Sequence, residues 1–380
     1  MAQTHRANTL KSVLVVGGGI AGMAAAIRLR EMGAAVEIVD RDQGWSVYGT
    51  GITLSPLTFR ALCHLGLKDE LRARAHCHDG VTINDAQGNL IREIRSERLV
   101  AANVPAEGAV LRPVLQDIMA VRVRELETTV RLGLSVEALI QDASGVDVTF
   151  TDGSNGRFDL VVGADGLQSH LRSLVLQGAP EPKHTGQSSW RVVFDTPDDW
   201  YQGQIFLGTD LKVGFNPCSP SQMYMYLLEP TPGNPRREPD QMPSILRGLL
   251  APFGGVVAKL RDTIIEPGQI VYRPLESVFV DGDWYRGRVV LIGDAVHTTT
   301  PHLGSGAGLA VEDALVLVDE LERADNVETA LRAFMRRRLG RARLVLGTSI
   351  RIGRMELAGD PAAEQAELMA ESVAAMAEPY

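Results

Sequence analysis

Residues 12–26 of the chain read SVLVVGGGIAGMAAA. The first part, Ser12 to Gly17, is apolar throughout, which is typical of a central parallel strand covered on both faces. The sequence then predicts an alanine-rich helix over Ile20 to Met32 and a second strand over Ala35 to Asp40. Strand, glycine turn, helix and strand make a βαβ unit, and its crossover is expected to be right-handed.

The glycine turn has the pattern Gly17-x-Gly19-x-x-Gly22, in the required context after a strand and before a helix. Gly17 allows a tight turn, Gly19 lets the backbone reach a pyrophosphate, and Gly22 lets the helix pack closely on the strand. Asp40 ends the second strand 18 positions after Gly22. That spacing is close to the ~20 residues expected for a carboxylate on a ribose hydroxyl. The turn predicts a dinucleotide site but does not separate FAD from NAD.

Two later stretches narrow the choice of cofactor. DLVVGADGLQSHLR places Asp165 and Gly166 directly after an apolar strand, and GRVVLIGDAVHTTTPHLGSGAG does the same with Gly293 and Asp294. A simple NAD dehydrogenase needs neither stretch. Together with the glycine turn, they resemble the three-part fingerprint of the para-hydroxybenzoate-hydroxylase-type, single-component (group A) FAD-dependent aromatic monooxygenases. The resemblance covers nearly the whole chain and keeps the order and spacing of the three parts.

The resemblance implies which residues contact FAD. The three glycines would cradle the pyrophosphate, the carboxylate after the second strand would hold the adenosine ribose, and one arginine would reach the cofactor from a helix start. One valine would lie where members use backbone groups against the adenine. Asp165 would serve both FAD and the nicotinamide donor, and Asp294 would hold the flavin-side ribitol or the pyrophosphate through structured water. The implied set is Gly17, Gly19, Gly22, Asp40, Arg41, Arg112, Val136, Asp165, Asp294, Pro301, Gly304, Ser305 and Gly306.

By the same resemblance, Pro301 to Gly308 would pass against the isoalloxazine ring. Glycines there would let backbone amides face the pyrimidine edge of the flavin, and the helix that starts there would direct its positive end at the ring. Such a helix start stabilises the anion of a reduced flavin by ~0.3–1 kcal/mol, or up to ~2 kcal/mol when partly buried. The chain departs from the family here, because Ser305 replaces the usual glutamine. In the second glycine loop, Ser55-Pro56-Leu57 replaces the usual Pro-Asn-Ala.

The reaction that the resemblance implies has two stages. NADH or NADPH binds transiently and reduces the flavin. The chain has only one complete GxGxxG motif, which fits a donor that does not stay bound. O2 then gives a flavin C4a-hydroperoxide, which inserts one oxygen atom into a small phenolic or N-heteroaromatic substrate. A base or a nearby cation would make that substrate electron-rich.

Candidates for that role come from the flavin loops and the expected substrate sheet: His302, Tyr48 and Arg191 as catalytic groups, and Phe215, Tyr224 and Tyr226 as pocket residues. Packing is the competing interpretation for each of them. Tyr224 and Tyr226 share one face by the period-two rule. His297 is interpreted as a structural residue that holds its loop.

The fold class that follows is α/β: a Rossmann-like FAD-binding βαβ domain with an inserted antiparallel-sheet substrate domain and C-terminal helices. Between Gly186 and Val280, short alternating stretches separated by turns are typical of a half-exposed antiparallel sheet. The predicted FAD-binding domain covers 1–185, with sheet segments from about 75–110, and returns with the helices over 281–380; the substrate domain covers 186–280. A long helix is predicted over Pro113 to Arg131.

Composition excludes several other classes. The net charge of −9 argues against a nucleic-acid or anionic-membrane partner. No apolar run reaches the ~20 residues of a membrane span, and three sparse cysteines suit a reducing cytoplasm. The histidines and cysteines around His76-Cys77-His78 match no zinc spacing, so no metal is expected. The chain is expected to be a monomer or homodimer.

Two charged stretches in the C-terminal part of the chain have structural rather than functional interpretations. The run Arg336 to Arg338, with Arg341 and Arg343, is expected to be a solvated helix face rather than a docking patch. Glu312 and Asp313 are expected to be first-turn partners of a helix dipole.

Three other functions share features with this sequence. An oxygenase for a larger polyketide or antibiotic is the nearest alternative, because the proline-rich stretch Glu229 to Pro243 could admit a larger molecule. A flavin-dependent reductase or halogenase on the same scaffold is the second, although the four tryptophans are scattered. A non-enzymatic flavin-binding sensor is the third.

Overall fold

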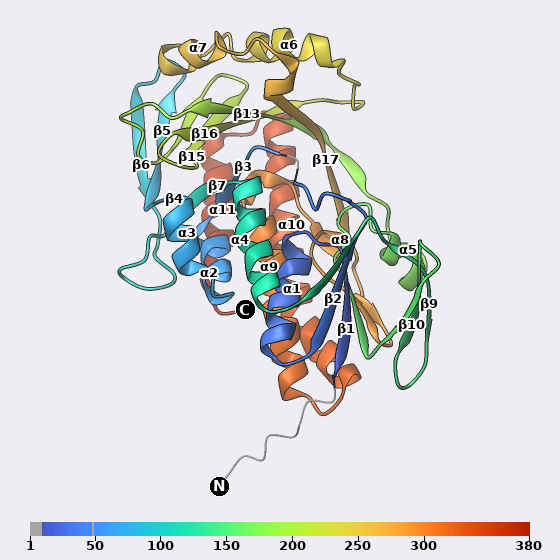
Figure 1. Cartoon of the computed structure of the whole chain (residues 1–380). Helices are drawn as coiled ribbons and strands as arrows, with labels where there is room; N and C mark the ends of the chain where they lie inside the picture. Colours follow the sequence, from blue (N-terminus) through green and yellow to red (C-terminus); the bar gives the residue numbers. More distant parts are fainter. Residues whose placement is uncertain (1–9, 48) are drawn as a thin grey trace.

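The computed structural model describes residues 10–47 and 49–380 (Figure 1). Its first layer is a six-stranded sheet built around the glycine turn, in which β1 pairs in parallel with both β2 and β12. The strand order is β18 (Tyr285–Arg286), β19 (Val289–Leu291), β12 (Leu160–Gly163), β1 (Ser12–Val16), β2 (Ala35–Asp40) and β8 (Thr129–Leu132). Because the chain leaves β1 for β2 on one side and later returns to β12 on the other, β1 marks the switch point where such sheets bind ligands.

The predicted βαβ unit is confirmed, with α1 (Ile20–Glu31) between β1 and β2. Helix α1 packs against α9 (Gly306–Arg323) and α4 (Arg112–Glu125). The long helix predicted from Pro113 to Arg131 is too long. Helix α4 ends at Glu125, and the β-branched TVRL segment pairs with β2 as the edge strand β8 instead.

The second layer is a seven-stranded, mainly antiparallel sheet. Its order is β17 (Ile270–Phe279), β13 (Lys183–Asp195), β16 (Gln222–Pro230), β15 (Lys212–Pro217), β14 (Gly203–Leu207), β5 (Gly80–Asp85) and β6 (Leu90–Arg95). The last two strands come from an earlier part of the chain, and β5 joins β14 in parallel. The division of the chain into domains at 185 and 280 stays a prediction.

The two faces of this sheet have different neighbours. One face carries an aromatic and aliphatic cluster that includes Trp190 and Phe206 and packs with α6 (Met242–Leu249) and α7 (Gly255–Arg261). Figure 1 shows these two helices lying across the sheet at the top of the molecule. The other face contacts the small sheet that contains β3 (Gly51–Leu54), and this is the face on which the site lies.

The remaining elements complete the layers. Two three-stranded sheets are formed by β3, β7 (Glu107–Leu111) and β4 (His76–His78), and by β11 (Asn155–Phe158), β10 (Val146–Phe150) and β9 (Val136–Gln141). The other helices are α2 (Pro56–His64), α3 (Lys68–Arg74), α5 (His170–Val175), α8 (Asp294–His297), α10 (Val327–Ala358) and α11 (Ala362–Ala377), with short 3₁₀ turns η1 (Pro239–Gln241), η2 (Pro267–Gln269) and η3 (Pro301–Leu303).

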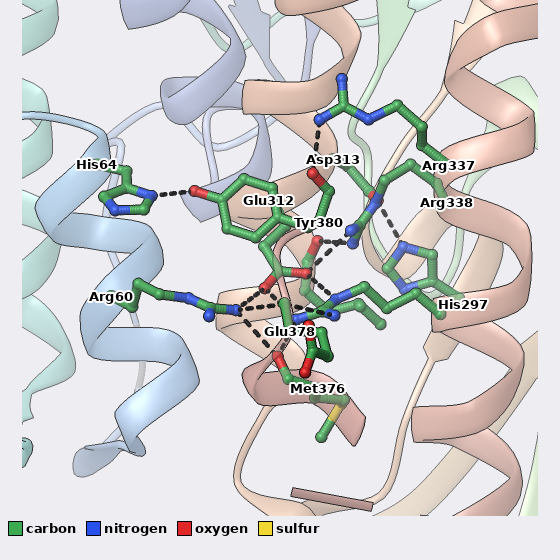
Figure 2. A network of polar contacts seen from close by, with 12 residues as sticks. Arg60, His64, His297, Glu312, Asp313, Arg337, Arg338, Met376, Glu378 and Tyr380 are labelled. Carbon is green, nitrogen blue, oxygen red and sulfur yellow. Dashed lines mark hydrogen bonds and ion pairs between the residues drawn. The ribbon is translucent and has the colours of Figure 1, made fainter. Parts of the chain in front are cut away.

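A buried charge network joins α9 to α10 (Figure 2). Arg338, which is fully buried, donates to Asp313 Oδ1 over 2.7 Å and to Glu312 Oε2 over 2.9 Å. Arg341 and Arg60 also pair with Glu312. The expectation that Glu312 and Asp313 serve only the helix dipole is therefore wrong, because both face the interior against arginines.

The basic run on α10 is likewise not one solvated face. Arg336 and Arg343 are exposed, but Arg337 is half-buried and donates to Glu320 Oε1 over 2.6 Å, and Arg338 is in the core. The helical period turns neighbours in the run toward different surroundings. Within residues 10–47 and 49–380, no group of His, Cys, Asp and Glu side chains could hold a metal ion, and no helix is long and apolar enough to cross a membrane.

Candidate active site

The three motif glycines differ in the space around them. A Cβ added at Gly17, whose φ is +106°, would lie 2.3 Å from the carbonyl oxygen of Ala164. A Cβ at Gly22 would lie 1.8 Å from the carbonyl oxygen of Gly17, whereas a Cβ at Gly19 would meet nothing within 4 Å. Gly17 and Gly22 are therefore required by packing of the protein itself, and Gly19 faces an open space that a ligand can enter.

The N-terminus of α1 opens onto the same space. Its N-cap is Gly19, no side chain caps its first turn, and that turn contains no acidic residue. The first amides of a helix have no partner within the helix and carry partial positive charge. This end of α1 is therefore free to bind an anion.

Asp40 holds the glycine turn in shape. Its Oδ2 accepts a hydrogen bond from the amide of Gly18 over 2.6 Å, and its Oδ1 accepts one from the amide of Asp42 over 2.8 Å. Trp45, a residue that sequence reasoning missed, donates from Nε1 to the carbonyl of Gly18 over 2.8 Å and is buried. A role of Asp40 on the ribose stays a prediction, and Arg41 beside it is exposed.

The different surroundings of Gly19 and Gly22 give a matched pair of substitutions. We expect Gly22→Ala to lower the free energy of unfolding by about 1–3 kcal/mol, because the new methyl group forces α1 away from β1. Gly19→Ala should leave stability within about 0.5 kcal/mol of wild type and weaken FAD binding about tenfold. Urea denaturation and titration with FAD measure the two effects. Equal stability loss in both variants would contradict this division of roles.

Asp165, at the second corner, is engaged within the protein. Its two carboxylate oxygens accept hydrogen bonds from Ser169 Oγ over 2.5 Å and from the amide of Leu171 over 3.0 Å, so it shapes the start of α5. Arg172 is buried and donates to the carbonyl of Ala295 over 2.9 Å. This arginine ties the second corner to the third, and no motif in the sequence identified it.

The third corner lies against the first. Gly293 has φ +60°, and a Cβ there would lie 2.9 Å from the Cβ of Ala21 in the first turn of α1. The side chain of Asp294 is solvent-exposed. Burial nevertheless raises the pKa of Asp294, with His297 and Arg112 acting in the opposite direction. The carboxylate of Asp294 is therefore close to the Arg112 side of the glycine turn and also open to solvent.

His297 anchors this corner. Its Nε2 is 2.5 Å from Oδ2 of Asp313, and the same oxygen accepts a hydrogen bond from the amide of Gly293 over 2.9 Å. His297 is buried and packs against Trp284, with 5.0 Å between the ring centroids. The structural role predicted for His297 agrees with these contacts, which hold the loop from behind.

The corner at residues 301–308 is fixed by α2. Gly304 has φ +58°, and its carbonyl oxygen accepts hydrogen bonds from Ser55 Oγ over 3.2 Å and Thr58 Oγ1 over 3.3 Å. Ser305 donates its hydroxyl to the carbonyl of Leu303 and therefore does not cap α9. The amides of the first turn of α9, which starts at Gly306, are left without a capping side chain. Pro301 opens the η3 turn that precedes them.

Helix α4 points two unsatisfied polar atoms toward this region. Arg112 Nε and Gln116 Oε1 are buried and have no hydrogen-bond partner. The two residues lie four positions apart, so they share one face of α4. Gln116 Nε2 donates to the carbonyl of Gly18 over 3.3 Å, which places this face beside the glycine turn. Buried groups of this kind are normally satisfied, so these two atoms fit a polar ligand at the glycine turn.

Arg112 and Arg191 form a pair of neighbouring cations. Burial lowers the pKa of the Arg191 guanidinium, and the charge of Arg112 lowers it further, while Tyr224 acts in the opposite direction. Burial also lowers the pKa of Arg112, while Tyr224 and the Asp294 carboxylate act in the opposite direction. Among the described residues, neither arginine forms an ion pair within 4.0 Å. Two neighbouring desolvated cations create a site for an anion.

Tyr224 lies between this pair and the second glycine loop. Its hydroxyl contacts Thr53 Oγ1 and accepts a weak hydrogen bond from Asn216 Nδ2 over 3.4 Å. Its ring packs so closely on β3 that a Cβ at Gly51 would lie 2.0 Å from it. Burial raises the pKa of Tyr224, so the hydroxyl stays protonated at neutral pH.

Tyr226 shares this face of the sheet, as predicted, with 6.0 Å between the two tyrosine ring centroids. Phe215 does not. It lies in the cluster on the opposite face, where its ring packs edge-on against Phe206 with 5.8 Å between centroids. The expectation that Phe215 lines the same pocket fails because alternation along β15 turns Gly214 and Asn216 toward the tyrosines and Phe215 away from them.

The other candidates are placed as follows. His302 is buried, with Nδ1 2.8 Å from Thr300 Oγ1 and Nε2 3.2 Å from Glu356 Oε2, so both ring nitrogens are engaged within the protein. Val136 is the buried first residue of β9. Tyr48 lies outside the described residues.

Known proteins resemble this chain over nearly its whole length. The sequence model of the family described as FAD binding domain matches residues 11–349. YetM of Bacillus subtilis is 31% identical over 98% of this chain and 100% of its own. The 2-heptyl-3-hydroxy-4(1H)-quinolone synthase of Pseudomonas aeruginosa is 32% identical, with 90% and 89% covered. The structure of Klebsiella pneumoniae HpxO complexed with FAD and uric acid has a TM-score of 0.84 and 25% identity, with 99% and 97% covered.

Proposed function

The chain belongs to the FAD-dependent monooxygenases of the aromatic hydroxylase family, and on that premise we propose that it hydroxylates a small phenolic or nitrogen-heteroaromatic substrate bound as an anion. The observation that carries the proposal is the pair Arg112 and Arg191, two desolvated cations beside Tyr224 that form no ion pair within 4.0 Å among the described residues. Relatives support it, since a quinolone synthase and a complex with uric acid both involve nitrogen heterocycles that carry acidic N–H or O–H groups.

The residues around the glycine turn fit FAD. Gly19 leaves open space at the N-terminus of α1, where a pyrophosphate finds free amides. Arg112 Nε supplies an unsatisfied donor for a phosphate oxygen, and Gln116 Oε1 an unsatisfied acceptor for a hydroxyl of the cofactor. The uncapped start of α9 offers amides for the pyrimidine edge of the flavin. When bound, FAD supplies the redox chemistry: it accepts a hydride from NADH or NADPH and activates O2 for transfer of one oxygen atom.

The chain's own residues bind and orient the substrate. Arg191 balances the negative charge of a phenolate or deprotonated heterocycle. The negative charge of the deprotonated substrate raises the electron density of its aromatic ring. Tyr224, protonated and held by Thr53 and Asn216, is oriented to donate a hydrogen bond to an anionic oxygen or nitrogen. Tyr226 covers the same face, and its hydroxyl pKa is raised by burial, so it too remains neutral. These aromatic side chains exclude water from the reacting ring.

A direct test uses the purified protein loaded with FAD. NADH or NADPH oxidation is followed with and without hydroxyquinolones, urate, hydroxypyridine carboxylates and simple phenols. We expect at least one acidic aromatic to stimulate oxidation and to gain the mass of one oxygen atom, and its neutral O-methyl or N-methyl analogue to have little effect. Halide-dependent product, or stimulation only by a large polyketide, would contradict the proposal. Cytoplasmic location and a monomeric or homodimeric state stay predictions.

A further inference from the structure

Glu356, near the end of α10, is the meeting point of three segments. One carboxylate oxygen pairs with Lys212 Nζ. The other accepts a hydrogen bond from Gln187 Nε2 over 2.9 Å and lies 3.2 Å from His302 Nε2. The Glu356 side chain is 15% exposed, so these contacts form in a largely desolvated place where they are stronger than in water.

The three segments are the ones that form the proposed site. Gln187 lies on β13, which also carries Arg191. Lys212 opens β15, whose Asn216 contacts Tyr224. His302 lies in the flavin-facing turn between Pro301 and Gly304. One carboxylate therefore links two strands of the substrate-facing sheet to the loop expected against the flavin.

The hydrogen bonds of His302 fix the orientation of its ring. Thr300 Oγ1 and Glu356 occupy its two nitrogens, so the ring has a single orientation. Helix α10 approaches closely because residue 353 is glycine. A Cβ at Gly353 would lie 2.9 Å from both His302 Cε1 and Gln187 Oε1.

Beside the close contact with Gly353, the packing around His302 leaves a space. A chamber of about 100 Å³ lies behind His302, and Ser349 Oγ in its wall is buried without a partner. The polar contacts of Glu356 therefore add to the packing of α10 in fixing the position of the loop.

We propose that Glu356 is a positioning residue that holds the flavin-facing turn 301–304 in register with the substrate-facing strands β13 and β15. The proposal rests on the proposed function, which assigns the turn to the flavin and the two strands to the substrate. The Glu356 carboxylate keeps its charge over a wide pH range. Burial would raise the pKa of Glu356, but His302 and Lys212 outweigh burial and hold the pKa at about 2. The carboxylate is thus charged throughout the range in which the enzyme would work.

The test compares Glu356→Ala with Glu356→Gln in the FAD-loaded protein. We expect Glu356→Ala to increase amide hydrogen exchange at residues 300–308 about tenfold, because local opening of the turn becomes easier, and to shift the visible absorption spectrum of bound FAD. Glu356→Gln keeps the hydrogen-bond acceptor and should restore most of the protection. Glu229→Ala is the matched control, because Glu229 is 11% exposed, pairs with Arg237 and lies on the same sheet without contacting the loop.

A second pair of variants covers the case in which Glu356→Ala does not fold. Gly353→Ala should displace His302 and reproduce the spectral shift, whereas Gly347→Ala on the same helix meets nothing within 4 Å and should not. Unchanged exchange and spectrum in Glu356→Ala or Gly353→Ala, with only a lower melting temperature, would overturn the proposal. Neither readout needs turnover, so failure of every aromatic compound to react would count against the proposed function alone.

Discussion

Replacing Arg338 by methionine is expected to lower the free energy of unfolding by about 3–5 kcal/mol. The guanidinium is fully buried and donates to Asp313, Glu312 and the carbonyl of Leu309 over 2.7 to 3.0 Å. Its removal leaves two buried carboxylates with less compensation, and methionine fills the volume without replacing the charge (Figure 2). Urea denaturation of the two proteins measures the difference.

The deficit should depend on pH. In the wild type, burial by itself raises the pKa of Asp313, but His297 and Arg338 outweigh it and hold the pKa below its ordinary value. A depressed pKa contributes stability above the unfolded pKa that is lost as pH falls through the folded pKa. Without Arg338 the buried carboxyls favour protonation, so the stability of the variant decreases as pH rises above about 4. The difference between the two proteins should therefore be larger at pH 7 than at pH 4.

The matched control is Arg332→Met on the same helix. Arg332 pairs with Glu328 at the surface, where both side chains are more than half exposed, and such a pair contributes at most about 0.5 kcal/mol. A loss in Arg338→Met no larger than that of the control would show that the network adds little to stability. Because the network also holds His297 and the amide of Gly293, FAD affinity should fall together with stability.

The second large effect is expected at Arg191. Arg191→Met should lower kcat/KM for an accepted acidic aromatic about 10²- to 10³-fold. Without the guanidinium, the negative charge of the bound substrate is buried and unpaired. Arg191→Lys keeps the charge and should recover part of the loss. Steady-state oxidation of NADH or NADPH, with product measured by mass, gives both values.

FAD binding separates this role from a cofactor role. We expect Arg191→Met to bind FAD with unchanged affinity, and Arg273→Met, an exposed arginine on the neighbouring strand β17, to resemble wild type in every measurement. If Arg191→Met lost FAD instead, the arginine would belong to the cofactor site, and the proposal of an anionic substrate would fail.

Sequence patterns determined the parts of the site that depend on local backbone geometry. The βαβ unit follows from the period of its apolar residues, and the corners at Gly17, Gly293 and Gly304 follow from glycines that adopt positive φ in the structure. Each corner directly follows or precedes a predicted strand or helix. Such features need only a few neighbouring residues, so they can be read before the chain is folded.

Tertiary structure alone decided the environments of the charged and aromatic side chains. Arg338 lies in a run of arginines that looks solvated, yet carboxylates from α9 meet it in the core. Phe215 turned to the far face, and Trp45 closed on the glycine turn. His302, a candidate base in the sequence, is held by Glu356 from 54 positions away. The energy of a buried charge or ring depends on partners that are distant in sequence, and no local pattern encodes which partners arrive.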